Sequence, residues 1–257
     1  MGQLLLFVAL PVAVVSAIRG IWSPCGLSML SSITPMTEAG RGNRFNVTAA
    51  WFLFGGIVGG LSLGLIAAGG AALLGLAHLS LEALIGAGAL AALVFAAIDF
   101  GIGGIELPIF KRQVNDAWLR RYRSWVYGAG FGWQIGFGVA TYIMTAGIFL
   151  TIALAVLTTS PLQAIAIGLT FGVVRGSAVY IGRSATTPAA LGQVHERLEA
   201  AAPVARDAAA WIQVAAAATL AAVAWHPLIA LAVLVAALAS TRAGAGVRPG
   251  FGSQPHS

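Results

Sequence analysis

The sequence predicts an all-α polytopic membrane protein, a bundle of six or seven transmembrane helices. Hydrophobic residues make up 59% of the 257 residues and charged residues only 9%, whereas a soluble domain averages about 25% charged residues. The chain also holds 33 glycines, a residue that is commoner in membrane helices than in soluble ones. The apolar residues gather in runs close to the roughly 20 residues that a membrane-spanning helix needs.

Six apolar runs have the length of a span, and a seventh is shorter. The shorter run, 228–240, follows Pro227, so it is either a seventh helix or a kinked continuation of the sixth. We expect one transmembrane domain over residues 1–241 and a disordered tail, rich in Gly, Pro and Ser, over 242–257. The six longer runs cover residues 4–22, 47–70, 79–100, 125–157, 161–182 and 207–225.

The formal net charge of +6 is explained by membrane topology, and no nucleic-acid partner is expected. Arginines and a lysine lie in the connections after the first, third and fifth runs, whereas the connections at 76–80 and 158–161 carry none. Cytoplasmic loops are enriched in these residues. We therefore expect a plasma-membrane protein with its N-terminus outside. The basic residues of these three connections are Arg41, Arg44, Lys111, Arg112, Arg120, Arg121, Arg123, Arg183, Arg197 and Arg206.

Two runs carry glycine at every fourth position, which places the glycines on one helix face. The series are Gly56, Gly60, Gly64 and Gly128, Gly132, Gly136. Small residues on one face allow neighbouring backbones to approach closely. We interpret both series as sites of close helix packing, with a substrate path along the groove as the alternative.

The stretch from Trp22 to Met36 is the most unusual part of the chain, because it is apolar and yet contains two prolines and the single cysteine. Pro24 and Pro35 disfavour a continuous helix. Irregular backbone at membrane depth is tolerated where protein or a wet cavity surrounds it. We expect Cys25 to be buried at a helix break, either as a nucleophile or metal ligand or as an inert core residue.

The Ser23-Pro24-Cys25 motif, followed by Pro35, resembles the first motif of the CcdA/DsbD transmembrane family, the thiol-electron carriers of cytochrome c maturation and periplasmic reduction. The basic segment Arg120–Arg123 before Gly130–Trp133 extends the resemblance, which covers about residues 15–225. It implies two inverted three-helix repeats, Cys25 as the catalytic residue and a thioredoxin-like partner. The membrane protein of methylamine-utilisation clusters is another relative that the residues do not separate from this family.

The chain departs from that family at its second motif. After Trp133 it reads Gln134, Ile135, Gly136, so a glycine aligns with Cys25 and the second cysteine is absent. A dithiol cycle needs two sulfurs. Three functions therefore stay open, and with them the questions of enzymatic activity and oligomeric state: thiol exchange with a partner protein, transport of a small solute or soft metal, and a non-catalytic membrane subunit.

A soft-metal site is one role that the cysteine suggests. Met29 lies four residues after Cys25, so both side chains share a helix face. Thiolate and thioether ligands suit Cu(I), whereas the alternative is that the methionine fills a gap in the core. No other cofactor is expected.

Three charged residues lie within apolar runs: Arg19, Asp99 and Arg175. Such residues pair with one another or line a path, unless they snorkel toward the headgroups. The predicted topology places Arg175 and Asp99 at a similar depth. We therefore expect these two to be paired or bridged by water, with snorkelling as the alternative.

Overall fold

The computed structural model describes residues 3–102 and 118–225, together with residues 229, 232 and 235 of the last apolar run. This part of the chain is mostly helical and contains no strand. The helices are α1 (Gln3–Arg19), η1 (Gly20–Trp22), α2 (Pro24–Ser32), α3 (Pro35–Gly40), α4 (Phe45–Gly75), α5 (Leu81–Asp99), α6 (Trp118–Arg121), α7 (Ser124–Phe137), α8 (Gly147–Leu157), α9 (Pro161–Ser177), η3 (Ala178–Ser184) and α10 (Pro188–Ala224).

Five helical segments are long and apolar enough to cross a membrane, which confirms a multi-pass membrane helix bundle. Their lengths run from 19 to 37 residues, and their mean hydropathy from 1.5 to 2.3. The tail expected at 242–257 and most of the run at 228–240 lie outside the described residues. The segments are Gln3–Trp22, Phe45–Gly75, Leu81–Asp99, Pro161–Ser184 and Pro188–Ala224.

Two expected element boundaries were wrong. The run 125–157 is not one helix, because α7 ends at Phe137 and α8 begins at Gly147. Gly138 has a φ of +73°, a left-handed conformation that ends a helix. The charged segment before residue 207 is not a loop: α10 already begins at Pro188, where the Thr187 side chain accepts a hydrogen bond from the Ala190 amide and caps the helix.

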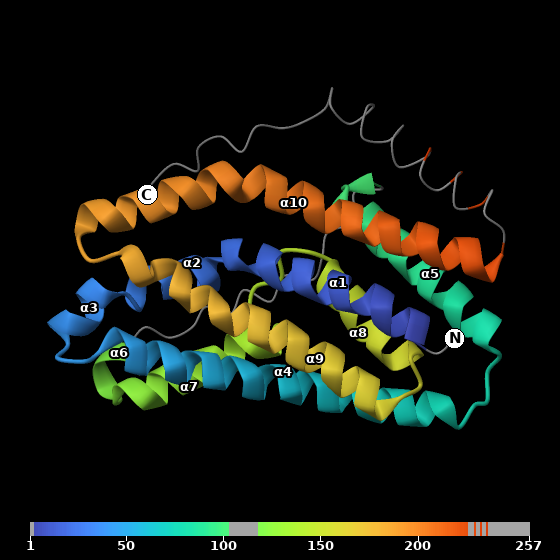
Figure 1. Ribbon diagram of the computed structural model, residues 1–257, viewed down its shortest axis with the longest axis horizontal. Helices are drawn as coiled ribbons and strands as arrows, with labels where there is room; N and C mark the ends of the chain where they lie inside the picture. The colour runs from blue at the N-terminus through green and yellow to red at the C-terminus, as the bar shows by residue number, and fades with distance from the viewer. Residues whose placement is uncertain (1–2, 103–117, 226–228, 230–231, 233–234, 236–257) are drawn as a thin grey trace.

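The helices lie side by side along the long axis of the molecule, and α1 runs opposite to the α7–α8 pair (Figure 1). Helix α1 packs on α8, α4 on α9, and α5 on α10. Helix α4 also packs on α7, and α1 also packs on α9 and α10. The arrangement as two inverted three-helix repeats stays a prediction.

The basic segments gather at one end of the bundle. Helices α3 and α6 and the start of α10 all lie at the left of Figure 1, whereas the α4–α5 and α8–α9 connections lie at the right, near the N-terminus. The arginines within or next to these three helices therefore share one end of the bundle, and the connections that lack Lys and Arg share the other.

Helix α4 is held between α7 and α9 by glycine contacts. A Cβ atom added at Gly132 would overlap the Phe52 carbonyl, and one added at Gly60 would lie 2.6 Å from the Gly172 Cα atom. The prediction of close packing is thus confirmed for both glycine series. A third series on α9, with the same spacing, supplies the facing surface: Gly168, Gly172 and Gly176.

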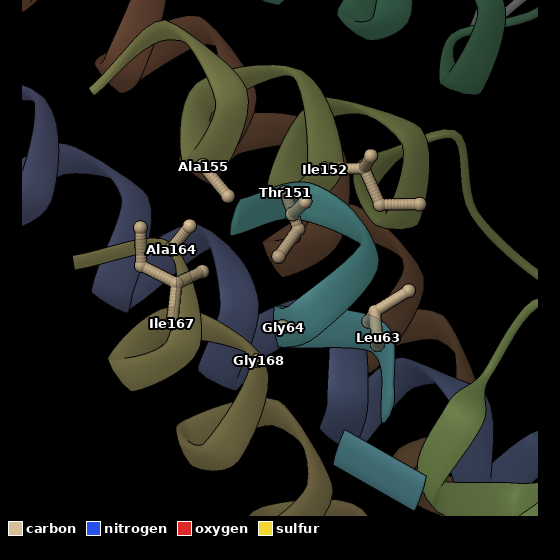
Figure 2. Close-up of a pocket in the computed structure, with 9 residues that line it drawn as sticks. Leu63, Gly64, Thr151, Ile152, Ala155, Ala164, Ile167 and Gly168 are labelled. Atoms are coloured by element: carbon tan, nitrogen blue, oxygen red, sulfur yellow. The ribbon is translucent and has the colours of Figure 1, made fainter. Parts of the chain in front are cut away.

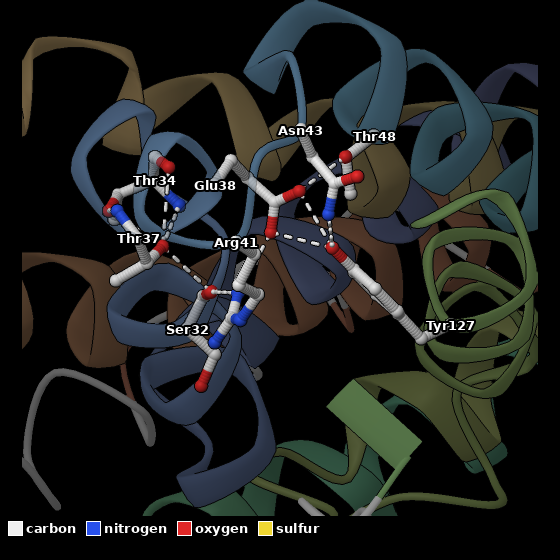
Figure 3. Close-up of polar contacts among 8 residues, drawn as sticks. All are labelled: Ser32, Thr34, Thr37, Glu38, Arg41, Asn43, Thr48 and Tyr127. Carbon is white, nitrogen blue, oxygen red and sulfur yellow. Dashed lines mark hydrogen bonds and ion pairs between the residues drawn. The ribbon is translucent and has the colours of Figure 1, made fainter. Parts of the chain in front are cut away.

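A buried carboxylate fixes the entrance to α4 (Figure 3). Glu38 has no exposed surface, yet it accepts hydrogen bonds from Tyr127 at 2.7 and 2.8 Å and from Thr48 at 2.6 Å. Arg41 forms an ion pair with it at 2.8 Å. These contacts join α3 to α4 and α7, so this carboxylate is satisfied by groups from three helices.

The first prediction concerns the glycine interface. Replacing Gly60 with Ala should lower the free energy of unfolding by about 1–3 kcal/mol, because the new methyl group meets backbone on α9 that cannot rotate away. Unfolding of the purified protein in detergent measures this. Gly69→Ala on the same helix is the control, since its methyl group would meet open space. Equal stability losses for the two variants would contradict the packing argument.

The second prediction concerns Glu38. Glu38→Gln should cost about 1.5–3 kcal/mol of unfolding free energy, because buried hydrogen bonds to a charged group are lost. Glu82→Gln is the control, since Glu82 is exposed at the start of α5. A double-mutant cycle with Tyr127→Phe should show coupling between the two sites. Additive losses would argue against a shared network.

Candidate functional site

Cys25 lies directly after a break in the first membrane segment. The Ser23 side chain accepts a hydrogen bond from the Gly26 amide at 3.1 Å and so caps α2, with Pro24 at the first helical position. Cys25 follows and is 2% exposed. Pro35 starts α3 in the same way, after Thr34 at the N-cap. Each proline stands where its missing amide is not needed, and the chain turns twice between α1 and α4.

A second break separates α7 from α8, and Asp99 supports it from a neighbouring helix. The Ala146 amide donates to Asp99 Oδ1 at 2.7 Å, and the Thr145 hydroxyl and the Gln213 amide donate to Oδ2. Asp99 therefore caps the start of α8 with a negative charge, which favours a helix N-terminus.

Arg175 extends from α9 into the space between the two breaks and is 3% exposed. Its guanidinium donates to the Ala17 carbonyl at 3.2 Å, the Ile135 carbonyl at 3.3 Å and the Ser23 hydroxyl at 3.5 Å. A Cβ atom at Gly20 would overlap the guanidinium. Gly20, at the first break, therefore leaves the space that the Arg175 side chain occupies.

A direct ion pair between Arg175 and Asp99 was expected and is wrong, and so is snorkelling for Arg175. The Asp99 carboxylate accepts hydrogen bonds from the start of α8 and from Gln213, whereas Arg175 donates hydrogen bonds to carbonyls of α1 and α7. In the described part of the chain, ion pairs join Arg41 to Glu38 and Arg206 to Asp207. Arg175 takes part in neither.

Arg19, the third charged residue of the apolar runs, differs from Arg175 and Asp99 in its surroundings. It is 9% exposed and interacts electrostatically with Asp99 and Arg206. One of its terminal nitrogens, Nη1, is buried without a hydrogen-bond partner among the described residues. The positive charge of Arg19 therefore faces the α5–α8–α10 side of the bundle.

A small pocket opens beside Arg175 and joins the two breaks. Its wall is formed by residues of α1, η1, α9 and the 138–146 connection. The Ser16 hydroxyl lies on this wall, is 3% exposed and has no hydrogen-bond partner in the described structure. The lining residues include Ser16, Gly20, Gly138, Tyr142, Met144, Thr145, Phe171 and Arg175.

A second pocket, between α4, α8 and α9, carries no comparable chemistry (Figure 2). Leu63, Ile167 and other aliphatic side chains and glycines line it. Its one hydroxyl, on Thr151, already donates to the Gly147 carbonyl at 2.8 Å. The polar pocket beside Arg175 is therefore the better candidate site.

The predicted metal ligands both lie in the protein interior. Met29 is buried in the core cluster beneath α2, and Cys25 interacts electrostatically with Arg175. Among the described residues, no group of three or more His, Cys, Asp or Glu side chains could hold a metal ion. A role of Cys25 or Met29 in metal binding stays a prediction.

The second motif serves helix packing. Gly136 faces α4, where an added Cβ atom would overlap the Gly56 carbonyl. Trp133 is exposed and stacks on Phe137, and its indole also reaches α4, where it donates to the Ser62 hydroxyl at 3.2 Å. Gln134 is partly buried. Moreover, Gly136 precedes a helix break, whereas Cys25 follows one.

Sequence reasoning missed several residues of this region. Gly20 and Ser16 carry no pattern that separates them from other small residues of an apolar run. Gln213 could have been found, because it is a single amide in an alanine-rich stretch of α10. The assembled site offers hydrogen-bond donors around one buried positive charge, an arrangement that can bind a polar or anionic group.

Comparison with known proteins found similarity to methylamine utilization proteins named MauF. The chain is 32% identical to that of Paracoccus denitrificans over 171 residues, which cover 63% of this chain and 59% of the relative. It is 31% identical to that of Methylophilus methylotrophus over 173 residues, 66% of this chain and 59% of the relative. It is 30% identical to that of Methylorubrum extorquens over 148 residues, which cover 57% of this chain and 52% of the relative.

The chain thus spans between half and three fifths of the length of these relatives. No family model matches it, and no solved structure matches it. The expected membership of the CcdA/DsbD family is wrong, and with it the expected roles in thiol-disulfide exchange and cytochrome c biogenesis, because the matching curated relatives bear the MauF name instead. The chain is similar to the MauF methylamine utilization proteins over about three fifths of its length.

Proposed function

We propose that this chain is a membrane-embedded accessory protein of methylamine utilization. The observation that carries the proposal is that relatives from different bacteria, each about 30% identical, share one name. We assign the pocket beside Arg175 as its functional centre, since intramembrane charges in a bundle interior mark functional sites.

We also propose that the protein resides in the plasma membrane with its N-terminus outside. The gathering of basic segments around α3, α6 and the start of α10 at one end of the bundle supports this orientation (Figure 1). Lys and Arg near the ends of spans favour the cytoplasmic side. The α4–α5 connection at the other end would then face outward.

The function is tested by complementation. In a Paracoccus denitrificans strain that lacks its own MauF, this chain should restore growth with methylamine as the sole carbon source. Arg175→Gln should abolish the restored growth, because the buried charge is lost, and Arg206→Gln should retain it, because Arg206 is exposed. Immunoblots of membranes check that all variants accumulate. If the strain's own MauF restores growth from the same plasmid and this chain does not, the proposal is wrong.

The orientation is tested by labelling single cysteines in a Cys25→Ser background. A membrane-impermeant maleimide added to whole cells should label Ala77→Cys, in the exposed α4–α5 connection, and should spare Gln193→Cys, near the exposed start of α10. Both positions should react after the cells are lysed. The reverse pattern on whole cells would invert the topology.

A further inference from the structure

We propose that the pocket beside Arg175 binds a small inorganic anion of about the size of chloride. This inference goes beyond the proposed function and stands on the geometry of the pocket. It explains how the bundle tolerates a guanidinium that is nearly inaccessible to water.

The first argument is charge. Burying an ionised group is costly unless an opposite charge or full hydrogen bonding compensates for it. Arg175 donates to two carbonyls at 3.2 and 3.3 Å and to a hydroxyl at 3.5 Å, all of them long for bonds from a charged donor. The ion pairs of the described chain do not include it. An anion in the adjoining pocket would supply the missing charge.

The second argument is the Ser16 hydroxyl. It lies on the wall of the same pocket, is almost fully buried and lacks a hydrogen-bond partner in the described structure. A buried hydroxyl without a partner costs free energy. A hydroxyl can donate to an anion, as the guanidinium can. Ser16 and Arg175 reach the pocket from α1 and α9, so an anion between them would bridge two spans.

Size and charge limit the ligand. The free space in the pocket is about that of one water molecule, so chloride would fit with a small outward shift of the lining side chains, whereas a large organic anion would require a much larger one. A protonated alkylamine would meet the positive charge of Arg175 at short range and be repelled. The Thr145 hydroxyl, also on the wall, is committed to Asp99. The site therefore selects a small anion over methylammonium.

Bromide locates the site directly. Crystals of the full chain grown with sodium bromide in place of chloride should show an anomalous peak within hydrogen-bond distance of the Arg175 guanidinium and the Ser16 hydroxyl. Absence of a peak at this position, in crystals whose other bromide sites are occupied, would overturn the proposal. A bromide peak in the pocket that lies beyond hydrogen-bond distance of both the Arg175 guanidinium and the Ser16 hydroxyl would also overturn it.

Affinity in solution supplies the second test. In detergent, chloride titrated against gluconate should raise the melting temperature of the wild-type protein and of the control Arg206→Gln. Ser16→Ala, which removes one small group and is expected to fold, should weaken the apparent chloride affinity by about tenfold, as the loss of a hydrogen bond to a charged group predicts. Arg175→Gln should abolish the chloride response. Equal chloride responses in wild type and Ser16→Ala would overturn the proposed contact.

Cys25 provides an internal alternative, because its sulfur interacts electrostatically with Arg175. If a Cys25 thiolate were the counter-charge, the wild-type protein would not respond to chloride, and Cys25→Ala would gain a response. That result would overturn the proposal. A chloride response of equal size in wild type and Cys25→Ala supports it.

Discussion

The contact of Gly56 with two other helices is the constraint on which the rest of the structure depends. A side chain at Gly136 would overlap the Gly56 carbonyl, and one at Gly56 would lie 2.7 Å from the Gly176 Cα atom. One residue of α4 therefore sets the distance to α7 and to α9 together. Gly136 follows Ile135 and Gly176 follows Arg175 in the sequence. The same contact therefore brings the Arg175 side chain to the Ile135 carbonyl, at 3.3 Å.

The two helix breaks are stabilised in different ways, and the difference shapes the site. At the start of α8, Asp99 brings a negative charge to the free backbone amides and has its own oxygens satisfied. At the first break, Ser23 caps α2 with a neutral hydroxyl while Arg175 contributes a positive charge. The pocket between them thus has, on one side, a carboxylate that accepts three hydrogen bonds and, on the other, a guanidinium that takes part in neither ion pair of the described residues. The anion that we propose would offset this asymmetry.

Much of the fold was readable from the sequence because its signals are local. Apolar runs predict spans, Pro24 and Pro35 predict breaks, and glycine at every fourth position predicts close packing. The break at Gly138 was missed because a glycine in the sequence does not by itself distinguish a helix end from a packing site. Gly136 packs against α4, whereas Gly138, two residues later, ends α7. The partners of Arg175 were missed for another reason. The positions of Asp99 and Arg175 within their apolar runs predicted a similar depth in the membrane. A similar depth does not determine which faces of the two helices meet.

The resemblance to thiol-electron carriers fails for a physical reason at Gly136. A second cysteine at this position would place its Cβ atom against the α4 backbone, so α7 would have to move away from α4. That movement would also separate the Ile135 carbonyl from Arg175. A cysteine at position 136 of α7 is therefore incompatible with the close packing of three helices around Gly56. The chain keeps the packing, and with it the buried arginine. What the central region of this bundle offers a partner or ligand is therefore a fixed positive charge rather than a pair of sulfurs.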